Sequence, residues 1–282
     1  CLIFSSFIFS GQASSASATL TPNSVVAGIS NQSFTYSLTF TGGTADSISI
    51  TNPLQNNSIA VTGITIDGNT KSLINQNLRP ANQGTISWFY DESNFKLIII
   101  CDSSLITNTA VISMVQSISQ NISSNNQYSS FYDDISDPSV SASAVESEWT
   151  LDIIPGPVSA IFIENSNDGT GEQIGNIALT TDGSLTLYSI GRDQYDNFVQ
   201  SVSSQWSVEN SIGSISPSTG TSTVFNPVSI GSGAISSQYQ TFSDQTGIIT
   251  VSGGLLSYLK VRSEAGGSGS EVGATTMTTD QS

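Results

Sequence analysis

Short stretches in which apolar and polar residues alternate run through most of the chain. The clearest covers residues 34–40, where Phe34, Tyr36, Leu38 and Phe40 alternate with Thr and Ser. Because successive side chains of a β-strand point to opposite faces, this pattern predicts a half-buried strand with four large apolar groups on one side. Gly, Asn, Asp, Pro and Ser clusters separate such stretches, and none keeps a helical period for three turns. The chain is therefore predicted to be all-β.

The predicted strands of residues 19–154 group into a first β-sandwich. An aromatic strand ends at Tyr90 in a polar turn, after which residues 95–100 are almost continuously apolar, as in a hairpin whose second strand is central. A last strand is predicted over residues 149–154. It is followed by Pro155-Gly156-Pro157. Since proline cannot donate a hydrogen bond to a β-ladder, we place a domain boundary there.

An internal repeat appears when the chain is compared with itself at a shift of about 98 residues, the length of one sandwich module. Residues 158–164, 169–175 and 180–184 match residues 256–262, 267–273 and 278–282. The apolar positions Ile161 and Ile163 recur as Leu259 and Val261, which indicates that they point inward. The sequence therefore predicts one complete repeat over residues 158–254 and the start of a further, truncated repeat over residues 255–282.

Several motifs follow the opening strands of the first copy. They are the turn Asp193-Gln-Tyr-Asp196-Asn197, the strand Trp206-Ser-Val208, the segment Gly213-Ser-Ile-Ser-Pro217 and the closing strand Ile249-Thr-Val251. With these motifs, residues 158–254 resemble the bacterial immunoglobulin-like repeats of invasin- and intimin-type surface proteins. The resemblance implies tandem immunoglobulin-like antiparallel β-sandwiches. In that family the turn is usually D-x-x-G-N, so Asp196 stands where glycine is commoner.

Composition and charge exclude several classes of function. The 282 residues include 22 acidic and only 6 basic side chains, for a net charge of −16, which repels phosphate backbones and anionic lipid headgroups. Nucleic acid and membrane insertion of the mature chain are therefore not expected. The chain has no histidine, which removes Ser-His and Cys-His catalysis, and its single internal cysteine, Cys101, is expected to be a buried thiol. We predict that the chain is not an enzyme and that it binds no cofactor other than possible calcium.

Two kinds of candidate site remain open. Asp193, Asp196 and Asn197 are calcium candidates, because oxygen-rich loops of extracellular sandwiches can bind this ion; the alternative is a solvated turn. Asp133, Asp134 and Asp137 are expected to form turns rather than a pair of catalytic carboxylates. The aromatic groups at residues 88–90 and 128–132 could form a sugar platform, or they could pack in the core and its rim.

The first 18 residues are predicted to be a clipped secretory signal peptide, since an apolar stretch precedes the small residues Ala16-Ser17-Ala18. The mature chain is then extracellular or on the cell surface. The predicted function is structural and adhesive, as a stalk or adhesin module; the alternative is a carbohydrate-binding or accessory module of a secreted polysaccharide-degrading enzyme. The expected partners are neighbouring repeats of the same chain and a host or matrix protein or a carbohydrate.

Overall fold

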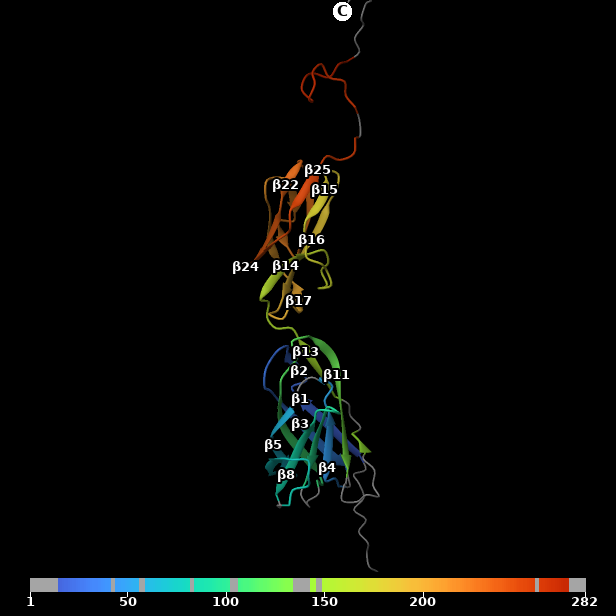
Figure 1. The fold of residues 1–282 in the computed structure, drawn as a ribbon, viewed down its shortest axis with the longest axis vertical. Helices are drawn as coiled ribbons and strands as arrows, with labels where there is room; N and C mark the ends of the chain where they lie inside the picture. The colour runs from blue at the N-terminus through green and yellow to red at the C-terminus, as the bar shows by residue number, and fades with distance from the viewer. Residues whose placement is uncertain are drawn as a thin grey trace, which may run out of the picture. The chain divides into compact units, whose positions relative to one another are not determined.

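The computed structural model describes residues 15–41, 44–55, 59–81, 84–101, 106–133, 143–145, 149–256 and 259–273 (Figure 1). Within these ranges the regular secondary structure consists of β-strands alone, so the all-β prediction is confirmed. None of the described residues forms a helix long and apolar enough to cross a bilayer. The chain divides into two compact units, the first made of Cys1–Ser159 with Arg192–Val199 and the second of Ala160–Gly191 with Gln200–Ser282.

The first unit is a sandwich of two sheets. One sheet has the strand order β1 (Ser15–Thr21), β3 (Gln32–Thr41), β10 (Thr109–Gln116), β5 (Ile59–Ile66) and β6 (Asn69–Thr70). The other has the order β2 (Ser24–Val26), β13 (Trp149–Ile154), β11 (Ser123–Asp133), β4 (Ser47–Thr51), β9 (Lys96–Ile100), β8 (Thr85–Asp91) and β7 (Ser72–Asn75), with β12 (Ser143–Ala144) also paired to β11. Most pairs are antiparallel, but β2 pairs with β13 and β7 with β8 in parallel.

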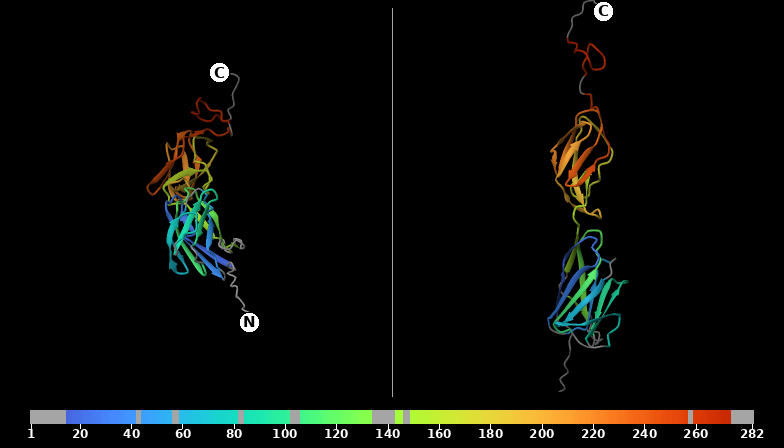
Figure 2. Two further views of the ribbon diagram at one scale, coloured as in Figure 1. Left: turned by 60° about the horizontal axis from the view of Figure 1, so that its bottom comes forward. Right: turned by 90° about the vertical axis from the view of Figure 1, so that its left-hand side faces the viewer.

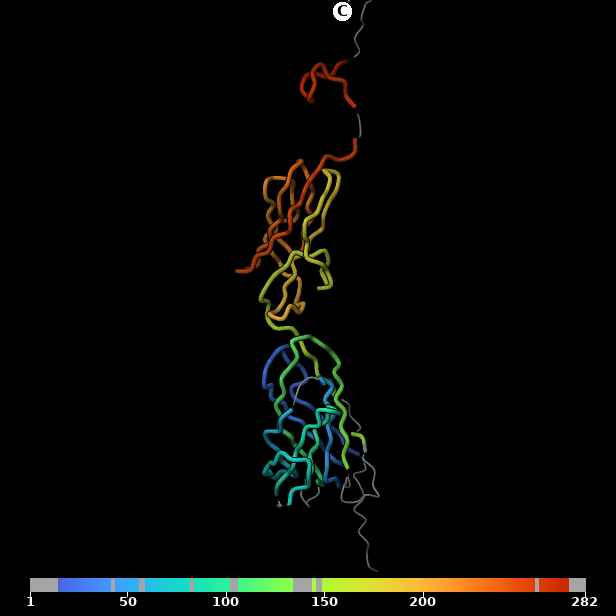
Figure 3. Tube along the Cα trace, in the orientation of Figure 1, coloured from blue at the N-terminus to red at the C-terminus, as the bar shows by residue number. Residues whose placement is uncertain are grey.

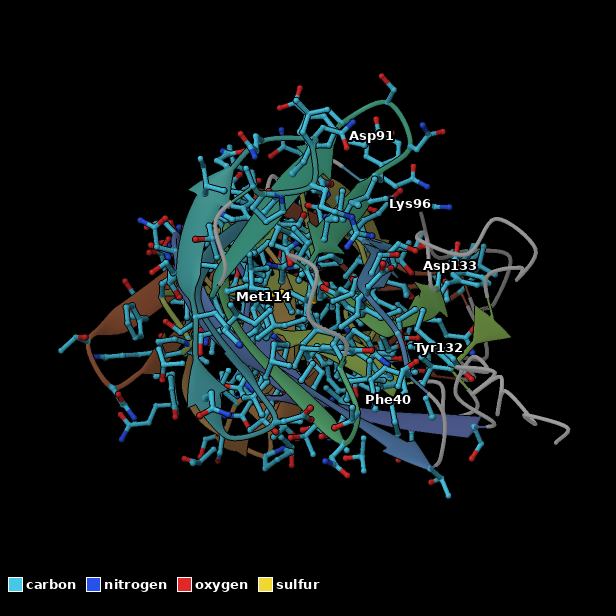
Figure 4. The ribbon with its side chains drawn as sticks, turned by 90° about the horizontal axis from the view of Figure 1, so that it is seen from below. Phe40, Asp91, Lys96, Met114, Tyr132 and Asp133 are labelled. Atoms are coloured by element: carbon cyan, nitrogen blue, oxygen red, sulfur yellow. The ribbon has the colours of Figure 1, made fainter. Side chains whose placement is uncertain are left out.

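Alternation along β3 produces the predicted face. Phe34, Tyr36, Leu38 and Phe40 are all buried, and the Thr and Ser residues between them are exposed or half-buried. The Phe40 ring meets the Tyr132 ring of the opposite sheet edge-on, with centroids 5.2 Å apart (Figure 4). Large apolar side chains from both sheets therefore meet in one core, which is the main source of stability of a sandwich. Cys101, directly after β9, is also buried, as expected.

The start of the chain differs in part from the sequence-based expectation. Residues 1–14 of the predicted signal peptide lie outside the described residues, but its last four residues form the first half of β1. Ala16 pairs with Phe40 and Ala18 with Leu38, and both alanines are buried. These small side chains alternate with serine and fit beside the large residues of β3, so the Ser-Ala pattern that suits a cleavage site also suits an edge strand.

Polar side chains in the first unit's core are hydrogen-bonded to one another. Gln116 Nε2 donates to Asn52 Oδ1 at 3.0 Å, and the Tyr128 hydroxyl donates to Gln116 Oε1 at 3.2 Å. The Tyr36 hydroxyl donates to Ser130 Oγ at 2.7 Å. Burial raises the pKa of both tyrosines well above its usual range. Because buried polar groups are costly when unpaired, these bonds favour one arrangement of the strands over its register-shifted alternatives.

The second unit, whose strands are yellow to orange in Figure 2, contains three small sheets. The first has the order β14 (Ala160–Glu164), β16 (Leu185–Arg192), β21 (Ser222–Pro227) and β19 (Gly213–Ser216), with β17 (Phe198–Ser201) also paired to β16. The second has the order β15 (Ile177–Thr180), β25 (Ile249–Ser252) and β22 (Gly231–Gly233), with β15 and β25 parallel. The third has the order β20 (Thr219–Gly220), β18 (Ser204–Val208), β23 (Ile235–Tyr239) and β24 (Phe242–Gln245).

An apolar core of its own holds the second unit together. Trp206 is part of this core and only 5% exposed, with Ile163, Leu187 and Phe225 among the buried residues of the same cluster. The indole Nε1 donates to the Gly220 carbonyl at 3.0 Å, so the one polar atom of this side chain is paired. Alternation along β18 therefore points Trp206 into the core.

Three buried serines interrupt this apolar core. Ser189 Oγ lies 2.7 Å from Ser204 Oγ, and Ser237 Oγ donates to Ser189 Oγ at 3.1 Å. All three side chains are almost completely inaccessible to solvent. They come from β16, from the first residue of β18 and from β23, so the chain of hydroxyls links two of the sheets of the second unit.

Candidate functional site

The turn predicted to bind calcium is organised around one buried carboxylate. Asp193 is only 4% exposed, and its Oδ2 accepts a hydrogen bond from the Gly156 amide at 2.9 Å. Its Oδ1 accepts from the backbone amides of Tyr195 and Asn197, each at 2.9 Å. The Asn197 side-chain amide also donates to Oδ2 at 3.0 Å. Both oxygens of the carboxylate are thus bonded to N–H donors.

These bonds change the acidity of Asp193. Burial alone would raise the pKa of this carboxyl, but the hydrogen bonds from the Asn197 side chain and from the backbone of Gly156, Asn197 and Tyr195 outweigh burial and lower the pKa below its usual value. The charged form is therefore the one that the turn stabilises.

The other two predicted ligands are placed differently. Asn197 lies beside Asp193, but its Oδ1 accepts from the Ile122 amide at 3.3 Å and its Nδ2 donates to the Gln120 carbonyl at 2.7 Å, both within the first unit. Asp196 has a φ of 66°, the left-handed region in which glycine is favoured, which agrees with its position in the motif. Its carboxylate is exposed and lies 3.7 Å from Arg192 Nε. The structure brings Asp193 and Asn197 together and leaves the Asp196 carboxylate apart.

No group of three or more His, Cys, Asp or Glu side chains that could hold a metal is found in the described ranges. Calcium at Asp193, Asp196 and Asn197 stays a prediction, and the observed geometry is that of a carboxylate that closes a turn.

Replacing Asp193 by alanine should open this turn. The amides of Gly156, Tyr195 and Asn197 would lose their acceptor, and because an unmade buried hydrogen bond costs about 1–3 kcal/mol, they should exchange with deuterium roughly tenfold faster or more. The lowered pKa means that the stabilisation is complete above the unfolded value of about 3.9 and is lost as the pH falls through the folded value. Hydrogen exchange between pH 3 and 6 measures both effects.

Two controls accompany this measurement. Asp193→Asn keeps an acceptor oxygen and removes the charge, so it should retain part of the protection and lose the acid dependence. Millimolar calcium should raise the melting temperature of the unaltered chain only slightly. A large calcium-dependent gain that Asp193→Ala abolishes would instead establish a calcium site.

The glycine-rich segment of the second unit forms a turn, whereas Asp133 does not lie in one. The Gly169–Gly171 region lies in a hairpin loop, where Asp168 Oδ1 accepts bonds from the Thr170 hydroxyl at 2.7 Å and the Ser166 hydroxyl at 2.8 Å. Bonds from Thr170 and Ser166 lower the pKa of Asp168 to about 2. The turn predicted at Asp133 is wrong, because this residue is the last of β11 and pairs with Ser47 of β4, whereas Asp134 and Asp137 lie outside the described residues.

Strand alternation divides the aromatic groups between two faces. Trp88 and Tyr90 pack against the first unit's core, and Tyr128 and Tyr132 are buried in it. Phe131 is on the other face of β11 and half-buried, with Lys96 Nζ 5.8 Å from its ring centroid. Most of these rings therefore pack in the core and its rim, which was one of the two alternatives.

The opening hairpin of the second unit recurs in the tail. Asn165 N donates to the Glu172 carbonyl at 3.1 Å and Ile174 N to the Ile163 carbonyl at 2.9 Å. The same bonds join Ser263 N to Ser270 O at 3.0 Å and Val272 N to Val261 O at 2.9 Å. Each donor and each acceptor residue of the second pair of bonds lies 98 positions after its counterpart in the first pair, as 263 does after 165. The isolated bridge between Glu164 and Gln173 likewise recurs between Arg262 and Glu271.

A hollow on the second unit corresponds to none of the sequence motifs. It has a volume of about 380 Å³ and is lined by Ser203, Gln205, Thr219, Gln238, Tyr239 and Gln240. These residues come from three strands and a turn that are separated along the chain, so only the strand pairing brings them together. The one signal in the sequence is that glutamine occupies outward positions of two β-strands.

No protein-family model matches the chain, and no curated protein sequence matches it. Among solved structures, the Yersinia pseudotuberculosis adhesin InvE is similar at 10% identity and a TM-score of 0.24, over 84% of this chain and 58% of that one. The T6 backbone pilin of serotype M6 Streptococcus pyogenes is similar at 10% identity and a TM-score of 0.35, over 83% and 52%. Domains 5–6 of the S-layer protein SbsC are similar at 9% identity and a TM-score of 0.22, over 84% and 97%. The chain thus spans little more than half the length of the first two structures.

Proposed function

We propose that this chain is an extracellular structural and adhesive segment, built from β-sandwich units in series, that spaces or presents a binding surface and performs no catalysis. In this role each unit holds itself together, and the number of units sets the reach of the protein.

The observation that carries this proposal is the recurrence of one hairpin at a fixed offset. The side chains differ between the copies, yet the backbone hydrogen bonds are the same. Glu172 N also donates to Asn165 Oδ1 at 2.9 Å, and the equivalent bond joins Ser270 N to Ser263 Oγ at 3.2 Å. A sequence that keeps a local structure while changing its surface is typical of tandem modules.

Composition supports the absence of catalysis. The chain has no histidine, and its charged residues are only 10% of the total. The surface is instead rich in Ser, Thr, Asn and Gln, which stay hydrated over a wide range of conditions without acting as acids or bases near neutral pH. Extracellular display suits such a surface, since no cytosolic cofactor or nucleotide chemistry is implied.

A spacer of this kind should unfold one unit at a time under force. We expect the full chain, pulled between its ends in single-molecule force spectroscopy, to give two separate unfolding events. A fully extended chain spans about 3.5 Å per residue, so the roughly 95 residues of the second unit's sandwich should release roughly 330 Å and the first unit roughly 500 Å. The two lengths identify the units.

Trp206→Ala provides the control, because it removes a core side chain of the second unit alone. It should lower the force of the shorter event and leave the longer one unchanged. A single event that releases both lengths together would contradict independent units and with them the proposed role.

A further inference from the structure

The hollow on the second unit lies on the outer face of the sheet formed by β20, β18, β23 and β24. The register places Thr219, Gln205, Gln238 and Ser243 in one row across all four strands. Because the side chains of a strand alternate, Gln205 and Gln238 point outward while their neighbours Trp206 and Ser237 are buried. The core beneath the hollow therefore fixes the backbone positions from which the two glutamine side chains project outward.

The polar groups around the hollow are not used by the protein itself. The side chains of Ser203, Gln205, Thr219, Gln238, Tyr239 and Gln240 line it. None of them forms a side-chain hydrogen bond to another group within residues 149–256, all of which are described. Amide and hydroxyl groups supply both donors and acceptors. Three residues with side-chain amides and three with hydroxyls thus border a single space of about 380 Å³, a volume typical of small-molecule sites.

The lining carries no charge, although the whole chain has a net charge of −16. The nearest acidic residues along these strands are already engaged: Glu209 Oε1 accepts from Gln245 at 2.7 Å, and Asp244 Oδ2 accepts from the Ile163 amide at 2.7 Å. A neutral, hydrogen-bonding ligand complements such a lining. An anionic partner, or a second copy of this acidic chain, would be repelled by the negative electrostatic potential of the protein.

Gln240 has an unusual backbone for its side chain. It is the first residue of the two-residue turn that joins β23 to β24, where Tyr239 pairs with Phe242, and the hairpin projects from the sandwich (Figure 3). Its φ of 53° is in the left-handed region that glycine adopts without strain, and glycine is the usual residue there. Keeping glutamine at this position costs stability but adds a third amide to the hollow.

From these observations we propose that this face binds a neutral carbohydrate. The amides of Gln205, Gln238 and Gln240 hydrogen-bond to sugar hydroxyls, and Tyr239, which is half-buried at the end of β23, borders the hollow. The hydroxyls of Ser203 and Thr219 complete the polar edge. This inference deepens the adhesive part of the proposed function and rests on it.

The test begins with the full chain and a panel of immobilised polysaccharides. Cellulose, chitin, starch, mannan and galactan are the neutral probes, and polygalacturonate and heparin are the anionic ones. We expect at least one neutral polysaccharide to retain the chain and neither anionic one to do so. An oligosaccharide of the retained polymer, titrated into the ¹⁵N-labelled chain, should shift the side-chain amide signals of Gln205, Gln238 and Gln240.

Substitutions then locate the site. The double variant Gln205→Ala/Gln238→Ala should bind about tenfold more weakly or worse, since two hydrogen bonds are removed. Gln200→Ala is the matched control, because this exposed glutamine lies on β17 and does not line the hollow. Gln240→Gly should raise the melting temperature while it weakens binding, two opposite effects that a purely structural role of Gln240 would not produce.

Several outcomes would overturn the proposal. They are retention by no neutral polysaccharide, equal affinity of the double variant and of Gln200→Ala, unchanged binding by Gln240→Gly, or binding of peptides in place of sugars. Each of these would leave the two unfolding events under force as they are, so failure of this inference is distinguishable from failure of the spacer role.

Discussion

Trp206→Ala should destabilise the second unit by about 3 to 5 kcal/mol, the range measured when a large buried aromatic side chain is truncated to alanine. The residue is 5% exposed and belongs to a core cluster of only eight buried residues among those described, so its truncation removes a large share of the packed volume. The variant also leaves the Gly220 carbonyl without its indole donor. Urea denaturation of the full chain, followed by circular dichroism, measures the loss.

A neighbour on the same strand provides the comparison. Ser207 is exposed on the opposite face of β18, so Ser207→Ala should change the free energy of unfolding by less than about 0.5 kcal/mol. If Trp206→Ala costs less than about 1 kcal/mol, the side chain does not have the central packing role described above.

In the first unit, Trp149→Ala should have an effect of similar size, about 3 to 5 kcal/mol. The Trp149 ring stacks on Tyr128 with centroids 4.6 Å apart and an interplanar angle of 12°, and it meets Tyr36 at 4.9 Å. Only 7% of the residue is exposed. Aromatic pairs contribute about 0.5–1.5 kcal/mol beyond the area they bury, so the loss includes two such contacts as well as a cavity. Hydrogen exchange of the β11 and β13 amides, followed during denaturation, measures the unfolding of the first unit separately from that of the second.

Trp149→Phe separates the contribution of the aromatic contacts from that of the cavity. Phenylalanine keeps a ring against Tyr128 and removes the indole Nε1, a buried donor without a hydrogen-bond partner in the described part of the chain. We therefore expect this variant to cost clearly less than the alanine variant. Equal losses from the two would mean that ring stacking contributes little and that the exact shape of the indole decides the stability.

Local features of the fold could be predicted from the sequence because they depend on alternation alone. The buried face of β3 and the inward position of Trp206 follow from a period of two residues. The parallel pairs β2–β13 and β7–β8 could not be predicted, because strand order depends on packing between segments far apart in the chain. At Ser15–Ala18 the same alternation suits a cleavage site and an edge strand equally, so the sequence alone does not distinguish the two.

The candidate sites show the same division. Sequence spacing identified the turn at Asp193, but not that the amide of Gly156, 37 positions earlier, would donate to its carboxylate. Gln205 and Gln238 carry no motif, and their common position on one sheet face becomes visible only through the pairing of β18 with β23. In both places the missing information is which donors and acceptors the fold brings within reach of one another.

The three buried serines of the second unit constrain how this core can evolve. Each hydroxyl of Ser189, Ser204 and Ser237 has another hydroxyl of the group as its partner. A single replacement by alanine leaves a partner unsatisfied in an apolar environment, whereas replacing the whole group by apolar residues removes that penalty. The mutational path from serine to an apolar core at these positions therefore passes through less stable intermediates. Substitutions there should be epistatic, so that homologous modules carry either the complete hydroxyl group or none of it.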